Sequence, residues 1–240
     1  MGTLSRKQRE IKEREALILD VATRMLVENG YLELSMDRIA EQIEYSKGTV
    51  YQHFSSKEDL VSAIVARTME TRADMFSRAA VYPGRARERM LGIGLASRLF
   101  IQLYPYHFKA EQVVRIDSIM GKAGENRRRR IEGCERRCIQ IVCGIIRDAI
   151  EQGDLTLPDE LTPEALTFSL WSMHFGGYAL MDSDPLQELG IDDPPYALYR
   201  SIMALLDGLG FAPLTSAWDY EATQEKIRRE VFASECSRLN

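Results

Sequence analysis

Strict alternation of polar and apolar residues, the pattern of a half-buried β-strand, is nearly absent from this 240-residue chain. Apolar residues recur instead every three or four positions along most of the sequence, which is typical of amphipathic helices. The sequence therefore predicts an all-α protein. A hydrophobic share of 45% suffices for a proper core, and the length fits one large domain or two smaller ones.

The chain also lacks the features of secreted, membrane-spanning and metal-binding proteins. Its four cysteines include no CxxC pair, and a chain of this length needs no disulfide framework. The start, MGTLSRKQREIKERE, is too charged for a signal peptide, and no apolar run approaches the roughly 20 residues that span a bilayer. No histidine or acid near Cys134 and Cys138 completes a ligand set at a recognised spacing. We expect a cytoplasmic protein without cofactor, metal or membrane partner.

An overall excess of basic charge is missing as well. The net charge of -5 and the pI of about 5.4 exclude a uniformly positive surface. They leave open a nucleic-acid binder with locally placed basic groups, because distribution matters more than the sum.

What the sequence does contain is a series of helices with clear boundary signals. A first helix is predicted over residues 7–29, with Gly30 as its C-cap. Ser35 and Ser46 are good N-caps for two short helices, and Val50 and Phe54 form a buried i, i+4 pair on the second of them. A long helix begins near Leu60. Further helices are expected over residues 85–104, 107–122, 125–152, 163–181, 196–209 and 215–239, with only a short turn between 182 and 195.

Two short helices joined by a tight turn form the helix-turn-helix pattern. With Val50 and Phe54 pointing inward, the outer face carries Lys47, Thr49, Tyr51, Gln52 and His53. Gly48 allows the backbone to approach a phosphate or base edge, and Lys57 adds charge at the start of the next helix. Gln52 is the side chain best suited to an adenine edge, because its amide both donates and accepts.

The stretch LSMDRIAEQIEYSKGTVYQHFSSKEDL, residues 34–60, resembles the signature of the TetR family of bacterial transcriptional regulators. The resemblance covers roughly residues 12–65. It implies a homodimer with a DNA-binding domain over residues 1–60 and a helical ligand-binding and dimerisation domain over residues 61–240. It also implies DNA contacts at Lys47, Gly48, Thr49, Tyr51, His53 and Lys57. We add Ser35, Arg38, Ser46 and Gln52 to this candidate set.

Three departures from the family pattern stand out. The turn reads Ile43-Glu44-Tyr45 where the family usually has Ala-Gly-Val, and a left-handed Glu44 would cost about 1 kcal/mol. Met36 replaces a frequent threonine, so Ser35 is the candidate replacement for its phosphate contact. The last helix lies beyond the two that the family usually pairs at its dimer interface.

Each of these functional interpretations has a purely structural alternative. The 47–54 helix could be a polar surface helix, although Gly48, Thr49 and Val50 together disfavour helix by roughly 2 kcal/mol relative to alanine. The arginines at 127–130 are a solvated face or an extra DNA contact. The charged N-terminal arm is a fraying helix start or a second contact to DNA.

Two apolar helices, 163–181 and 196–209, are expected to form a four-helix interface in a homodimer, unless both pack within the core. An effector cavity for a flat or lipophilic small molecule would be lined by Phe100, Tyr104, His107, Phe108 and Trp171, which would equally make a core.

The sequence thus predicts a repressor, not an enzyme, that binds a roughly palindromic DNA operator as a homodimer and responds to a small-molecule effector. Two other classes stay open. A helical enzyme would need paired acids or metal ligands, and a helical adaptor for protein partners would leave Lys47, Thr49 and His53 without a role.

Overall fold

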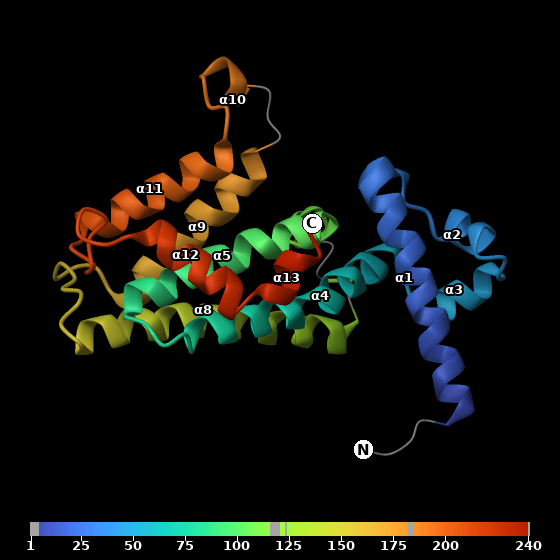
Figure 1. Ribbon diagram of the computed structural model, residues 1–240. Helices are drawn as coiled ribbons and strands as arrows, with labels where there is room; N and C mark the ends of the chain where they lie inside the picture. The colour runs from blue at the N-terminus through green and yellow to red at the C-terminus, as the bar shows by residue number, and fades with distance from the viewer. Residues whose placement is uncertain (1–4, 116–120, 123, 182–184, 240) are drawn as a thin grey trace. The chain divides into compact units, whose positions relative to one another are not determined.

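A computed structural model describes residues 5–115, 121–122, 124–181 and 185–239. All regular secondary structure in these ranges is helical, which confirms the all-α prediction. By packing, the chain forms two compact units (Figure 1). The first comprises Met1–Glu70 and Tyr104–Cys134, and the second comprises Thr71–Leu103 and Glu135–Asn240. The functional division into residues 1–60 and 61–240 stays a prediction.

The first unit holds the three N-terminal helices, α1 (Arg6–Glu33), α2 (Met36–Gln42) and α3 (Lys47–His53). Gly30 has φ 77° and ψ 176°, so the regular part of α1 ends there, as predicted, and one more turn follows. The start of α4 (Lys57–Ala80), all of α6 (Pro105–Val114) and the start of α8 (Glu125–Glu151) complete the unit.

The core of the first unit draws on all of these helices. Ile18 of α1, Ile39 of α2 and Val50 of α3 are fully buried in one cluster. Ala110 of α6 and Ile131 of α8 belong to the same cluster. Three helices of about 50 residues would be too small to close a robust core, and the later segments supply the rest.

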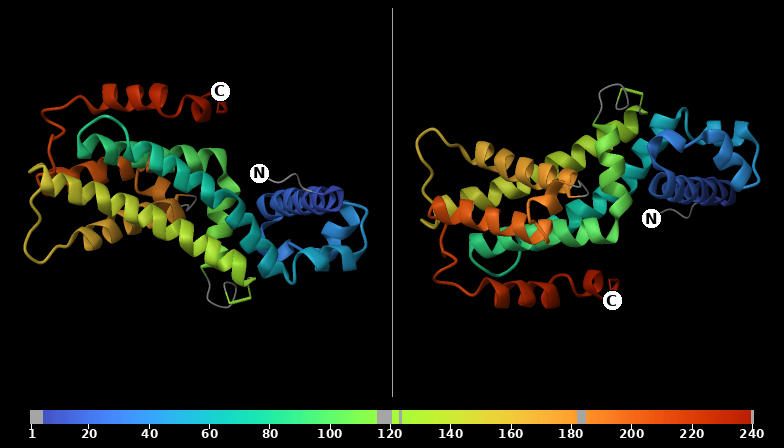
Figure 2. Two further views of the ribbon diagram at one scale, coloured as in Figure 1. Left: turned by 90° about the horizontal axis from the view of Figure 1, so that it is seen from below. Right: turned by 90° about the horizontal axis from the view of Figure 1, so that it is seen from above.

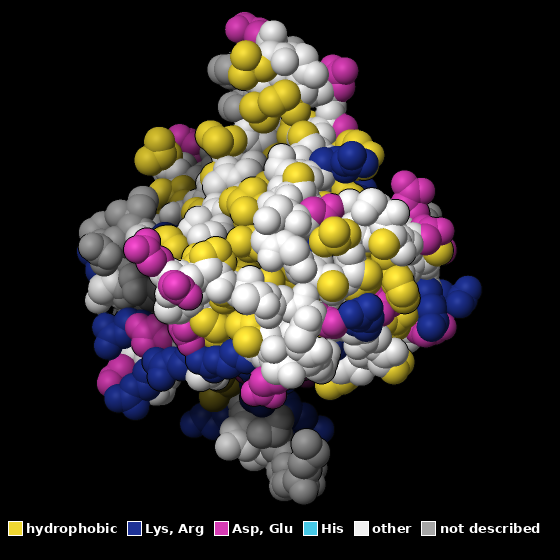
Figure 3. Space-filling model, turned by 90° about the vertical axis from the view of Figure 1, so that its left-hand side faces the viewer, with side chains coloured by type: hydrophobic (Ala, Val, Ile, Leu, Met, Phe, Trp, Pro, Cys, Tyr) yellow, Lys and Arg dark blue, Asp and Glu magenta, His cyan; other side chains and the backbone are white. Residues whose placement is uncertain are grey.

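The second unit contains α5 (Ala86–Leu103), α9 (Pro163–Leu180), α10 (Pro185–Glu188) and α11 (Pro194–Gly208), besides the remaining parts of α4 and α8. α9 packs against α11, and Gly177 makes room for the Leu198 side chain. α12 (Tyr220–Glu230) and α13 (Ala233–Ser237) lie along α5 (Figure 2). Hydrophobic side chains gather at the top of Figure 3. Leu189, which directly follows α10, is 74% exposed.

Two predicted helices were wrong in extent. The expected helix over 215–239 begins only at Tyr220, where Asp219 caps α12 by accepting from the Ala222 N–H at 2.9 Å. It is then interrupted once, at Val231 and the buried Phe232, before α13. The expected helix over 107–122 ends at Val114, and Gly121 and Lys122 form a turn. Residues 116–120 and 123 of that prediction, and 182–184 of the predicted short turn, lie outside the described residues. The turn itself is observed as α10.

Within the part of the chain that the structure describes, each helix is too short or too polar to cross a bilayer.

Candidate nucleic-acid interface

The turn between α2 and α3 keeps a left-handed residue without using glycine. Glu44 has φ 58°. The Tyr45 N–H donates to the Ala40 carbonyl at 3.0 Å, and the Glu44 N–H donates to the Glu41 carbonyl at 3.2 Å. This is the Schellman arrangement, in which the left-handed position is usually glycine because other residues are strained there. The family-type turn is therefore retained, with strain at Glu44.

Helix α3 presents the two faces that the sequence predicts. Val50 and Phe54 are 0% exposed, whereas Tyr51 is 50% exposed. The Ser46 hydroxyl accepts from the Thr49 N–H at 3.1 Å, so the predicted N-cap is observed. Its oxygen also lies 2.9 Å from the Thr49 hydroxyl. The outer face of α3 is thus set by one buried pair and one cap.

Gly48 is not required by the packing of the chain itself. A Cβ atom at this position would meet the Ser46 hydroxyl at 3.8 Å, which is ordinary van der Waals contact. Gly48 is exposed on α3, where alanine would favour the helix. The absence of a side chain there makes sense if another molecule approaches the backbone.

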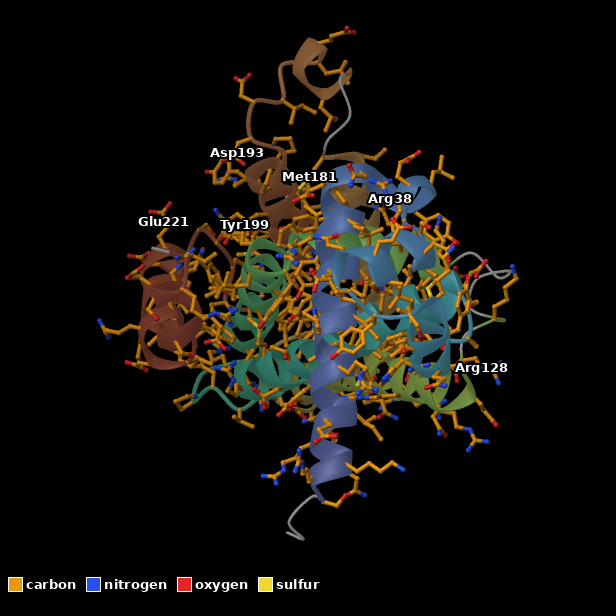
Figure 4. The ribbon with its side chains drawn as sticks, turned by 90° about the vertical axis from the view of Figure 1, so that its right-hand side faces the viewer. Arg38, Arg128, Met181, Asp193, Tyr199 and Glu221 are labelled. Atoms are coloured by element: carbon orange, nitrogen blue, oxygen red, sulfur yellow. The ribbon has the colours of Figure 1, made fainter. Side chains whose placement is uncertain are left out.

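The cationic side chains of the candidate set have partners within the first unit. Lys47 Nζ donates to the Asp37 carboxylate, which joins the N-terminal ends of α3 and α2 and raises the Lys47 pKa through that hydrogen bond. An Arg38 guanidinium nitrogen lies 3.5 Å from a Glu33 carboxylate oxygen. Figure 4 shows Arg38 on α2. A phosphate would have to compete with these carboxylates, which limits indiscriminate binding.

Lys57 is held by residues at the end of α1. Its Nζ donates to the Leu32 carbonyl at 3.1 Å and lies 4.2 Å from the centre of the Tyr31 ring. Burial lowers the Lys57 pKa, while the carboxylates of Glu58 and Glu33 oppose that effect. The lysine is therefore held at the start of α4 before any ligand arrives.

His53 is partly buried at the end of α3. Burial, the largest influence, lowers its pKa from 6.5; Glu15 opposes this, and the charges of Arg14 and Arg127 add to it. The neutral imidazole is thereby favoured at pH 7, and it offers one donor and one acceptor.

Arg127 is a supporting residue that the sequence did not reveal. One of its guanidinium nitrogens lies 2.6 and 2.7 Å from the two Asp59 carboxylate oxygens, and the other donates to the His53 carbonyl at 3.2 Å. The guanidinium carbon is 4.9 Å from the centre of the Phe54 ring. Arg127 thus joins the end of α3 to the start of α8. This structural role is neither of the two alternatives considered for the arginine run, a solvated face or a DNA contact.

The rest of the run is paired as well. Arg130 Nε lies 2.8 Å from a Glu70 carboxylate oxygen, and Arg129 pairs with Glu125. Arg128 lies 3.9 Å from Glu132, and Figure 4 shows its side chain at the surface. These pairs favour the solvated-face interpretation for residues 128–130.

The ten candidate residues are all placed on α2, on α3, on their N-caps or at the start of α4. Ser35 caps α2, because its hydroxyl oxygen accepts from the backbone N–H of Arg38 at 3.5 Å. Gln52 is exposed on the outer face of α3 beside Tyr51. The structure brings these side chains to one helix-turn-helix motif, and their contact with DNA stays a prediction.

The five residues predicted to line an effector cavity fall in both units. Tyr104, His107 and Phe108 belong to the first unit, and Phe100 and Trp171 belong to the second. His107 is 1% exposed; its Nδ1 is hydrogen-bonded to the Thr68 hydroxyl. Phe100 is 2% exposed. These contacts agree with the alternative that both are core residues, and their role in ligand binding stays a prediction.

The described residues contain no group of three or more potential metal ligands. The four cysteines are thiols that are not joined in disulfides.

Comparison with known proteins identifies the N-terminal region. A family model for bacterial regulatory proteins of the tetR family matches residues 18–64. An HTH-type transcriptional regulator of Staphylococcus aureus (strain USA300) is 32% identical over 63 residues, which are 26% of this chain. The matched segment spans only 34% of that relative.

Solved structures extend the likeness to the fold of most of the chain. A TetR/AcrR-family regulator from Thermobifida fusca YX-ER1 is 24% identical, with a TM-score of 0.64. The likeness covers 82% of this chain and 98% of that one. A transcriptional regulator from Saccharomonospora viridis, solved in complex with choline, is 20% identical with a TM-score of 0.62. The two chains are covered to 80% and 96%.

Proposed function

The chain belongs to the TetR family of bacterial regulatory proteins, and from this premise we propose that it regulates transcription by placing α3 in the major groove of DNA. The observation that supports this most directly is the outer face of α3. It combines an exposed tyrosine, an exposed glutamine and a glycine that the fold does not need. A surface helix without a ligand would more favourably carry alanine, glutamate or lysine there.

Two kinds of contact are proposed for this face. Lys47, Thr49, Tyr51 and Lys57 contact phosphates and set the position of α3, whereas Gln52 reads a base edge. Lys47 would exchange Asp37 for a phosphate oxygen on binding. His53 would hydrogen-bond a phosphate, and protonation of its imidazole would strengthen that contact.

The second unit is proposed to form a homodimer through α9 and α11. Most of α9 is apolar, yet only Leu166, Thr167 and Leu170 are buried in a single protomer. Phe168 is 63% exposed, and Gly176 has no atom within 4 Å of its Cβ position. α11 carries small residues at helical spacing, Ala197, Ser201, Ala204 and Gly208. Two such helices from each protomer make a four-helix interface.

A two-fold axis would present two copies of α3 to one duplex. The operator should then be roughly palindromic, with half-sites about one helical turn apart. We propose that the protein is a cytoplasmic repressor whose operator binding responds to a small molecule. Support comes from the family and from the Saccharomonospora viridis neighbour in complex with choline. Effector and operator would weaken each other's binding by the same factor.

The alternatives have less support. The described residues hold no metal-ligand group, and a helical enzyme would still need paired catalytic groups on facing helices. An adaptor for protein partners would not need the outward glycine on α3. A steep fall of affinity with added salt distinguishes DNA binding from an adaptor.

The test begins with selection of an operator from random duplex DNA, followed by gel-shift titrations. Tyr51→Ala and Lys57→Ala should weaken binding to all sequences about tenfold, and Gln52→Ala should relax preference at one base position. Gly48→Ala should fold normally and still lose binding, because its methyl group occupies the contact surface.

Val81→Ala is the control, because Val81 is 79% exposed and lies in the second unit outside α9 and α11. It should leave operator affinity unchanged. Unaltered affinity in all four α3 and α4 variants would overturn the proposed interface.

A further inference from the structure

The second unit contains a cavity of about 470 Å³ between α11, the 209–219 loop and the first turn of α12. This volume falls in the range of small-molecule sites. Figure 4 labels Tyr199 of α11 and Glu221 of α12, two of its lining residues. We infer that the cavity binds an organic cation, an alkylated ammonium group attached to an apolar or aromatic body.

Aromatic side chains form much of the cavity wall. Tyr196 is 51% exposed and Trp218 is 39% exposed, so neither is explained by burial in the core. The rings of Tyr196 and Tyr199 lie 6.3 Å apart with an interplanar angle of 35°. Aromatic faces carry partial negative charge and attract cations, and Trp is the strongest of them.

The ring of Trp218 is held in place. Its indole N–H donates to the Thr223 hydroxyl at 3.0 Å, and that hydroxyl donates in turn to the Asp219 carbonyl at 2.9 Å. A fixed indole loses little freedom when a ligand binds, so its contact counts fully towards affinity.

Charge on the lining favours the same ligand class. Among the described residues that line the cavity, Asp207, Asp219 and Glu221 oppose the single guanidinium of Arg200. The charge of Asp207 is balanced by the buried Arg87, whose guanidinium nitrogen lies 2.9 Å from an Asp207 carboxylate oxygen. Burial alone would raise the Asp207 pKa, but hydrogen bonds from Thr215 and the Arg87 charge hold it below 3.8. The cavity therefore keeps an excess negative charge, and an anion would meet both this charge and the ring faces.

The cavity lies away from the contact between α9 and α11. Tyr196, Tyr199, Met203 and Asp207 follow one stripe of α11 at helical spacing, whereas Leu198, which packs on Gly177, points to nearly the opposite side. All twelve lining residues belong to one protomer, and one of them, Ala204, is also part of the small-residue stripe of α11. The loop and α12 supply half of the lining, which gives this C-terminal segment a function. The inference does not depend on DNA binding.

The experiment compares two probes that share a phenylmethyl group but carry opposite charges. Benzyltrimethylammonium and phenylmethanesulfonate are titrated into the full-length protein by isothermal calorimetry. Saturable binding of the cation is expected, with the anion at least about tenfold weaker. No saturable binding of the cation, or equal binding of both, would overturn the inference.

Variants then locate the site. Tyr196→Leu keeps the apolar bulk but removes the ring face, and should weaken cation binding about two- to fivefold. Glu221→Gln should weaken it by a similar factor. Glu225→Gln removes the same charge from an exposed position of α12 outside the cavity, and should bind like the parent protein. Tyr51→Leu is the corresponding aromatic control. Equal effects of Glu225→Gln and Glu221→Gln, or none of Tyr196→Leu, would show that the cation binds elsewhere.

Discussion

Glu44 carries the local strain of the helix-turn-helix motif. Its φ of 58° meets the requirement of the Schellman turn but places its Cβ too close to its own carbonyl oxygen. The strain is tolerated because the two hydrogen bonds from Glu44 and Tyr45 to the end of α2 fix the turn. The strain at Glu44 therefore lowers the stability of the protein but leaves the geometry of the turn unchanged.

Glu44→Gly should raise the free energy of unfolding by about 0.5–1 kcal/mol, since glycine relieves the strain but gains freedom in the unfolded chain. Urea denaturation followed by circular dichroism measures the change. Glu41→Gly, at an exposed helical position of α2 only three residues earlier, should lower stability by about 1 kcal/mol. Shifts of the same sign in the two variants would contradict the strain argument.

At the scale of secondary-structure elements, the Asp59–Arg127 pair joins α4, α8 and the end of α3. The Asp59 carboxylate also accepts from the Gly124 N–H at 2.9 Å and from the Ser55 N–H at 3.0 Å. Burial alone would raise its pKa, but these backbone hydrogen bonds and the Arg127 guanidinium hold the pKa below 3.8. The charged form of Asp59 therefore stabilises the folded state more than the protonated form does.

Asp59→Asn should lower the free energy of unfolding by about 2–4 kcal/mol at pH 7, because Arg127 loses its charged partner. A folded-state pKa below the unfolded value means that the stabilisation is complete above about pH 4 and is lost as pH falls through the folded pKa. The difference between the two proteins should be constant above about pH 4 and should shrink as pH falls below that value in urea titrations. Asp20→Asn, which breaks the more exposed Arg67–Asp20 pair, should change stability by at most about 1 kcal/mol. A pH-independent difference for Asp59→Asn would refute the charge argument.

At the scale of the whole molecule, the proposed mechanism requires two protomers. Phe168→Glu places a charge on the outer face of α9 and should convert a dimer into monomers in sedimentation velocity, with a large loss of operator affinity. The fold of each protomer should persist, because Phe168 is 63% exposed. Val81→Glu introduces the same charge at a residue that is 79% exposed outside α9 and α11. It should remain dimeric, and a dimeric Phe168→Glu protein would exclude this interface.

The sequence predicted what depends on neighbouring residues and missed what depends on distant ones. The caps at Ser35 and Ser46 and the burial of Val50 and Phe54 follow from spacing within a few residues. The left-handed conformation of Glu44 was suggested by the family resemblance and not by spacing. Contacts such as Asp59 with Arg127 join residues 68 positions apart, and no local pattern specifies them. The continuous helix expected over 215–239 was wrong, since its periodicity hid the buried break near Phe232.

The first unit is built from segments that are distant in the sequence, which limits how its DNA-binding part can be transferred to another protein. α4 and α8 each run without interruption from one unit into the other, and Ala110 and Ile131 fill the core beneath α1 and α2. A chimaera built by grafting residues 1–60 onto a foreign regulator would leave that hydrophobic cluster open on one side. Modular exchange of DNA specificity in this protein calls for replacing the surface of α3 alone, on an otherwise intact chain.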